Sequence, residues 1–113
     1  MWKRANNLSG GSVVASGTFQ GSTSVTTKIT LGFKPKFLYI GPEDPNETYK
    51  YQIMYDDNFS ITQYLFSGGT TTAVETLGNT TNNRLSTIDN DGFTFNKCGS
   101  GVANNTWRYT AIE

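Results

Sequence analysis

Paired carboxylates are the residues in this chain with the most obvious chemical potential. Asp56 and Asp57 are adjacent, and Asp89 and Asp91 flank an asparagine. Two carboxylates on opposite sides of a sugar could act as the acid and the base or nucleophile of a glycoside hydrolase. Both pairs, however, stand beside Asn or Gly, where short polar side chains favour turns by hydrogen-bonding to the backbone. We therefore predict turns at these pairs and no catalytic residues.

The residue types on which most other catalytic and metal sites depend are missing or rare. The chain has no histidine and one cysteine, Cys98, which excludes histidine-based nucleophile activation and the common zinc sites. Residues 89–92 resemble the start of a calcium loop, but no glutamate follows where such a loop needs one. We expect no enzyme activity, no metal and no cofactor, and Cys98 as a small packing residue near a turn.

Tyrosines offer a possible binding surface. Three tyrosines share one face of a predicted strand, and a fourth lies on the next strand. Their rings could stack on the apolar faces of sugars, while nearby carboxylates and an amide bind hydroxyl groups. The same spacing is typical of core residues, so both interpretations stay open. The candidate glycan or partner contacts are Tyr49, Tyr51, Tyr55, Asp56, Asp57, Asn58 and Tyr64.

The composition limits the classes of partner. Nine basic and nine acidic residues give a formal net charge of zero, without the positive charge on which nucleic-acid and anionic-membrane binders rely. No apolar run approaches the roughly 20 residues of a membrane helix. Seventeen Thr, twelve Gly, eleven Asn and nine Ser give an uncharged, hydrogen-bonding surface. Such a surface suits contacts with other proteins in an assembly or with sugars.

Alternating apolar residues predict the elements that must position these side chains. Val13, Ala15, Gly17 and Phe19 share one face of a strand. One face of a second predicted strand contains Val25, Thr27, Ile29, Leu31 and Phe33. One face of the last predicted strand contains Trp107, Tyr109 and Ala111. Residues 37–40 are continuously apolar, which predicts a strand buried on both faces.

Turn residues separate these strands at intervals of about 8–12 residues. The strongest turn is predicted at residues 89–92, with Gly92 free to adopt a positive φ. The sequence therefore predicts an all-β protein: an antiparallel, jelly-roll-like β-sandwich of about eight or nine short strands, formed by residues 12–113. Residues 1–11 are expected to form an N-terminal arm, in which Trp2, Lys3 and Arg4 are candidate assembly contacts.

Three segments resemble a known family. Residues 16–41 read SGTFQGSTSVTTKITLGFKPKFLYIG, residues 91–96 read DGFTFN, and residues 106–113 read TWRYTAIE. They are similar to the small β-sandwich domain of bacteriophage tail-fibre, baseplate and other virion appendage proteins. The matching residues are mainly strand residues, a turn proline and a closing aromatic strand, so the resemblance implies an architecture and a viral setting but no binding residues.

This resemblance implies a non-enzymatic structural protein on the surface of a phage particle: a tail-fibre or baseplate accessory piece, or a capsid decoration. The expected partners are other virion proteins and further copies of the chain, with a trimer favoured. The alternative function is a carbohydrate-binding adhesin for host-surface glycans. A glycan-degrading enzyme is the third hypothesis, which the missing histidine and the turn setting of the carboxylates disfavour.

Overall fold

The computed structural model of the chain describes residues 13–43, 52–59, 62–67, 70–78, 81–99 and 105–113. Within these ranges, nine strands form two antiparallel sheets that pack as a β-sandwich, and a short 3-10 helix, η2 (Asp57–Phe59), follows the fourth strand. The all-β sandwich expected from the sequence is confirmed. The strands are β1 (Val14–Gln20), β2 (Thr27–Thr30), β3 (Phe37–Pro42), β4 (Gln52–Asp56), β5 (Thr62–Ser67), β6 (Thr70–Thr76), β7 (Leu85–Asp89), β8 (Gly92–Phe95) and β9 (Thr106–Ile112).

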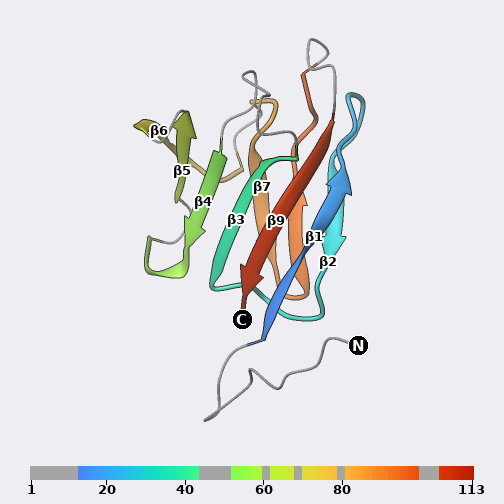
Figure 1. The fold of residues 1–113 in the computed structure, drawn as a ribbon, viewed down its shortest axis with the longest axis vertical. Helices are drawn as coiled ribbons and strands as arrows, with labels where there is room; N and C mark the ends of the chain where they lie inside the picture. Colours follow the sequence, from blue (N-terminus) through green and yellow to red (C-terminus); the bar gives the residue numbers. More distant parts are fainter. Residues whose placement is uncertain (1–12, 44–51, 60–61, 68–69, 79–80, 100–104) are drawn as a thin grey trace.

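The two sheets differ in width. The large sheet has six strands in the order β1-β9-β3-β4-β5-β6, and the small sheet has three in the order β2-β8-β7. Strands β3 to β6 follow one another as a meander, while β9 lies between β1 and β3. In Figure 1 the large sheet is in front and the small sheet lies behind its β3, β9 and β1 half.

The core lies between the sheets and contains the faces that alternation predicted. Trp107 and Ala111 are fully buried, and Tyr109 packs against the core. A chain of aromatic contacts crosses the sandwich: Phe19 meets Phe95 edge-on at 5.3 Å between ring centroids, and Phe95 meets Trp107 at 4.7 Å. Such contacts add stabilisation beyond the area they bury.

Two expectations about buried strands need correction. Residues 37–40 of β3 are not buried on both faces: Leu38 and Ile40 are in the core, but Phe37 and Tyr39 are half-buried on the outer face. The outer face of the large sheet has no covering layer among the described residues, so burial alternates along β3. Val25, assigned to the inward face of the second strand, precedes β2 and is 60% exposed.

The turn before β8 forms as predicted, but its glycine has another role. Asp89 pairs with Gly92, so residues 90–91 form a two-residue hairpin connection. Among the described glycines only Gly32 and Gly78 have a positive φ. Gly92 is buried, and a Cβ there would overlap the backbone carbonyl of Ile29 in β2. Glycine is therefore needed for close strand approach and not for turn conformation.

The domain has two different ends. Val14 pairs with Ile112, and the Glu113 amide donates to the Val13 carbonyl at 2.9 Å, so the start of β1 and the C-terminus lie together (Figure 1). At the opposite end, backbone hydrogen bonds join the connecting segments: Gly21 to Asn105 and Cys98 to Ser22. The start of β1 and the end of β9 thus share one end of the sandwich, and the segments after β1 and β8 meet at the other.

Candidate functional site

A cleft of about 370 Å³ opens between the large sheet and β7, at the end where the termini lie. Its walls come from four parts of the chain: the segment before β3, the end of β4 with η2, the turn after β6, and β7. Leu77 and Ile88 provide apolar surface, and hydroxyl, carboxylate and amino groups surround it. The lining residues are Lys34, Tyr55, Asp57, Leu77, Gly78, Ser86, Thr87 and Ile88.

Two residues predicted from the sequence, Tyr55 and Asp57, form one wall of this cleft. Tyr55 is the last inward-facing residue of β4, paired with Leu38, and is 3% exposed. Asp57 begins η2, and its amide donates to the Lys36 carbonyl at 2.7 Å. The Asp56 carboxylate accepts a bond from the Asn58 amide at 2.9 Å. This local bond is the turn chemistry that the Asp-Asp-Asn run predicted.

The surroundings of the Tyr55 hydroxyl favour its neutral form. Burial, together with the negative charge of Asp57 and a hydrogen bond to it, raises the pKa of Tyr55 above its usual value. The hydroxyl therefore stays protonated at neutral pH. Asp57 is the single carboxylate among the described lining residues, whereas glycoside hydrolases generally use two.

The opposite wall follows an irregularity in β7. The pairing of β7 with β8 shifts between Leu85 and Thr87, which leaves Ser86 as the extra residue of a bulge. A bulge changes the direction of the side chains that follow it. Ser86 and Thr87 thereby line the cleft, although the Thr87 hydroxyl itself donates to Asp89. With Lys34 and Asp57, the site can donate to and accept from a polyhydroxylated ligand.

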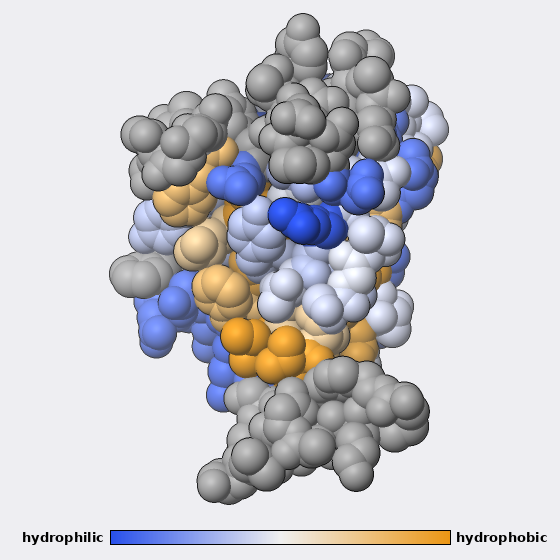
Figure 2. Space-filling model, viewed as in Figure 1, coloured by the Kyte–Doolittle hydropathy of each residue, from blue (hydrophilic) through white to orange (hydrophobic). Residues whose placement is uncertain are grey.

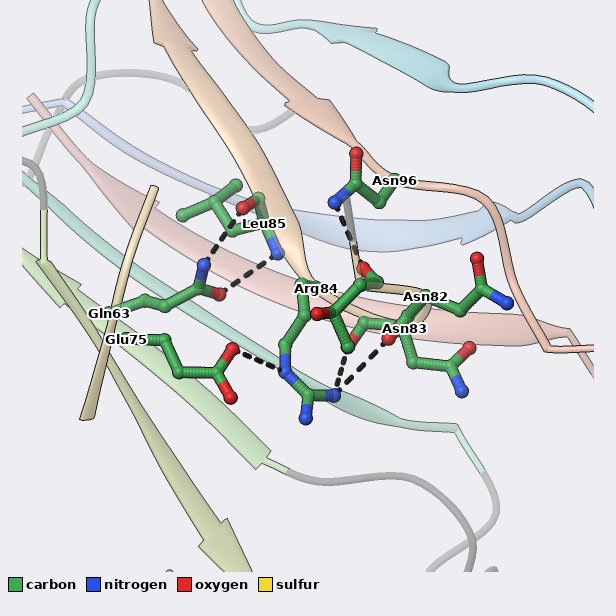
Figure 3. Close-up of polar contacts among 8 residues, drawn as sticks. Gln63, Glu75, Asn82, Asn83, Arg84, Leu85 and Asn96 are labelled. Carbon is green, nitrogen blue, oxygen red and sulfur yellow. Dashed lines mark hydrogen bonds and ion pairs between the residues drawn. The ribbon is translucent and has the colours of Figure 1, made fainter. Parts of the chain in front are cut away.

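A buried amide joins the edge of β7 to the large sheet, as Figure 3 shows. The Gln63 side chain from β5 donates to the Leu85 carbonyl at 2.9 Å and accepts from the Leu85 amide at 3.0 Å. Both residues are fully buried. Strand β7 is an edge strand of the small sheet. At Leu85, the Gln63 side chain makes the two backbone hydrogen bonds that a neighbouring strand would otherwise make. It fixes β7 at Leu85, directly before the residues that line the cleft.

An ion pair beside Gln63 strengthens this connection. Arg84 Nε donates to Glu75 Oε1 at 2.9 Å, and the two side chains are 11% and 27% exposed. Arg84 also donates to the carbonyls of Asn82 and Asn83 at 3.2 and 3.3 Å, and the Asn96 side chain donates to the Thr81 carbonyl (Figure 3). These bonds satisfy carbonyls of an irregular segment. Together they secure the approach to β7.

A second charged cluster lies on the outer face of the small sheet. Lys28 Nζ bonds to Asp89 at 2.8 Å and to Asp91 at 2.7 Å. Asp89 also accepts from the hydroxyls of Thr87 and Thr94, each at 2.8 Å. Burial alone would raise the pKa of Asp89, but the hydrogen bonds from Lys28, Thr94 and Thr87 outweigh it and hold the pKa below its usual value.

This cluster predicts a pH dependence of stability. Because the folded pKa of Asp89 lies below the unfolded one, its contribution is complete above roughly pH 4 and is lost as the pH falls through the folded pKa. We expect Asp89→Asn to lower the free energy of unfolding at pH 7 by at most about 1 kcal/mol, since the carboxylate is partly exposed. Urea unfolding from pH 7 to pH 2 should show the two proteins converging in acid. A difference that persists at pH 2 would contradict this.

The structure places the two described tyrosines of the candidate set on opposite faces of the large sheet. Tyr55 faces the core, whereas Tyr64 pairs with Met54 and lies on the outer face of the large sheet. Asp57 and Asn58 are exposed near Tyr55, and Asp56 is half-buried on the outer face. Five other candidates lie outside the described residues: Tyr49, Tyr51, Trp2, Lys3 and Arg4.

Sequence analysis missed the residues opposite Tyr55. Lys34 lies in the segment before β3, and Ser86 and Thr87 lie in β7; only the tertiary fold brings these residues near Asp57. The two predicted carboxylate pairs are separate turns, as expected: one adjoins η2 and the other the β7–β8 hairpin.

The described part of the chain contains no group of three or more His, Cys, Asp or Glu residues that could hold a metal ion. None of its helices is long and apolar enough to cross a membrane.

Comparisons of the chain with models of protein families, with curated proteins and with solved structures found no match. Function is therefore inferred from the chain itself.

Proposed function

We propose that the protein is a non-enzymatic structural protein of a bacteriophage particle: a tail-fibre or baseplate accessory piece, or a capsid decoration. It acts by assembly and display at the virion surface, and its partners are other virion proteins and further copies of itself. The similarity of residues 16–41 and 91–112 to phage appendage domains supports the setting.

The observation that carries this proposal is the difference between the two ends of the sandwich. The start of β1 and the end of β9 lie side by side at one end. A hollow of about 410 Å³ at the start of β1 has walls of Val13, Val14, Ala15, Ser16, Leu31 and Phe33. Apolar surface of this kind is typical of protein contacts. The other end, with the polar segments 21–26 and 96–99, then faces outward.

Imaging tests the proposal directly. Antibody fragments raised against the purified chain should label intact particles, at fixed positions, when the phage that encodes it is examined by electron microscopy. The control is the same fragment blocked by excess purified protein. Particles that carry no label, with the chain found solely in the infected-cell lysate, would contradict a place in the virion.

A second function, recognition of host-surface glycans, is favoured by the cleft beside Tyr55. Its size suits one sugar unit, and its carboxylate, amine and hydroxyls are the groups that bind sugar hydroxyls. An adhesin role is compatible with a place on the particle.

Substitutions in the cleft test glycan recognition. Asp57→Ala and Lys34→Ala should each weaken binding of fluorescent protein to host cells at least about tenfold, because a hydrogen bond to a charged group contributes roughly 1.5–3 kcal/mol. Lys97→Ala is the matched control, because Lys97 is an exposed lysine that does not line the cleft. Tyr55→Ala would disturb the core, so Tyr55→Phe is the suitable hydroxyl deletion. Unchanged labelling by all three cleft variants would exclude this cleft as the glycan site.

A further inference from the structure

The outer face of the large sheet carries several large apolar side chains, and no layer of the described residues covers it. Strand register places its side chains in cross-strand rows. One row contains Ser16, Thr110, Tyr39, Met54, Tyr64 and Val74, and the row below it contains Val14, Ile112, Phe37 and Asp56. Val74 is 56% exposed. Figure 2 looks onto this face and shows hydrophobic residues at its lower end and along its left side.

The apolar residues form a diagonal band. It begins at Val14 in β1, passes through Tyr39 in β3 and ends at Phe66 in β5, each one row higher than the last. Tyr39 lies flat along the sheet, because its ring covers Gly41 and its hydroxyl accepts a bond from Gln52 Nε2 at 3.2 Å. A flat apolar band is suited to packing against another flat surface.

The charges beside this band are self-complementary. Among the described outer-face residues of the large sheet's strands, Asp56 and Arg108 are the charged ones. Arg108 is beside Gly41, one row above Tyr39 on β9, and Asp56 is beside Phe37, one row below it on β4. The two charges thus lie at equal and opposite offsets from Tyr39. Rotation of a second copy about an axis along the band exchanges their positions.

We propose that this face is a homodimer interface, in which two copies pack the large sheets together about a two-fold axis that runs along the band through Tyr39. Arg108 of each copy then faces the partner subunit's Asp56, and Val14, Tyr39 and Phe66 meet their own equivalents. An isologous contact of this kind is the commonest form of protein self-association. The proposal rests on the self-association that we assign to the virion protein, and it replaces the trimer favoured from sequence with a pair.

The size of the face sets the expected affinity. Six strands about 4.8 Å apart and two to three rows about 7 Å apart give a footprint on the order of 400 Å². Interfaces at the small end of the specific range bury about 600 Å² per partner. The dimer should therefore form reversibly, with a Kd in the micromolar range. A sugar ligand fits this face less well, since sugars and other small ligands bind in concave sites and the band is flat.

Sedimentation velocity of the full chain tests the proposal. We expect a concentration-dependent monomer–dimer equilibrium that Arg108→Glu weakens at least tenfold, because each introduced carboxylate would face the partner subunit's Asp56. Exchange of the charges in Arg108→Asp with Asp56→Arg should restore the wild-type Kd. Lys97→Glu makes the same charge change away from the face and should leave the Kd unaltered.

Three results would overturn the dimer: a monomer at all concentrations up to about 1 mM, a trimer, or an equilibrium unaffected by Arg108→Glu. Thermal unfolding confirms that each variant is folded. The outcomes also separate this inference from the virion proposal. A chain that labels particles but never dimerises contradicts only the interface, while a dimer that labels no particle contradicts only the virion setting.

Discussion

Replacement of Gln63 by leucine will lower the free energy of unfolding by about 2–4 kcal/mol. The Gln63 amide satisfies both the N–H and the C=O of Leu85 in a fully buried position. Leucine leaves both backbone groups without that partner, at roughly 1–3 kcal/mol each, and the added apolar burial offsets about 1–2 kcal/mol of the loss. Urea unfolding monitored by tryptophan fluorescence measures the difference.

Gln52→Leu is the matched control for this prediction. Gln52 also donates one side-chain hydrogen bond, but it lies half-buried on the outer face and its acceptor, the Tyr39 hydroxyl, can turn to water. We expect a loss below about 1 kcal/mol. If the two leucine variants are equally stable, the amide link does not hold β7.

A change of Gln63 to glutamate adds a pH test. A carboxylate can accept from the Leu85 amide but repels the Leu85 carbonyl, so the folded protein favours the protonated acid and raises its pKa. Relative to wild type, Gln63→Glu should therefore gain stability as the pH falls toward the unfolded glutamate pKa of about 4.3. A difference from wild type that does not change with pH would contradict the proposed geometry.

Replacement of Gly92 by alanine will have an effect at least as large, about 3–5 kcal/mol or failure to fold. A methyl group at this buried position overlaps the Ile29 carbonyl and approaches the Thr30 Cα to 3.1 Å. Backbone atoms cannot rotate away as a side chain can. Strand β2 must move from β8, and the hydrogen bonds from the Leu31 and Gly32 amides to the Asp91 carbonyl, 2.7 and 3.0 Å, would be disturbed.

Gly99→Ala controls for the general effect of removing a glycine. A Cβ at Gly99 would make an ordinary contact with the Asn83 side chain at 3.4 Å. We expect its stability to change by less than about 1 kcal/mol, measured by circular dichroism during thermal unfolding. Equal effects of the two alanine substitutions would show that space at Gly92 is not the constraint.

Much of the fold followed from local pattern. Alternation along residues 13–19 and 107–111 identified inward faces that the structure confirms, because a strand side chain has only two directions to point. The carboxylate pairs were recognised as turns for the same local reason. Continuous apolarity in residues 37–40 was misleading, since it does not distinguish a strand covered on both faces from one with a half-buried outer face.

The cleft could not be predicted in the same way. The sequence identified Tyr55 and Asp57 but grouped Tyr55 with Tyr64, which lies on the other face. Lys34 and Ser86 reach the site from distant segments, and a bulge in β7 determines where Ser86 lies. Pairing between distant strands carries no local signal, so neither position could be assigned from spacing.

The four aspartates of the two carboxylate pairs separate what local sequence determines from what tertiary structure determines. The sequence by itself determined that Asp56, Asp57, Asp89 and Asp91 lie where strands of an all-β chain give way to turns, because their neighbours favour local backbone bonding. Tertiary structure alone decided their partners. Asp57 lies beside Tyr55 in the cleft, and Asp89 and Asp91 both bond to Lys28. Asp56 lies on the outer face of the large sheet, on the opposite side of Tyr39 from Arg108. Those relations depend on strand order and register, which arise from the packing of the whole sandwich.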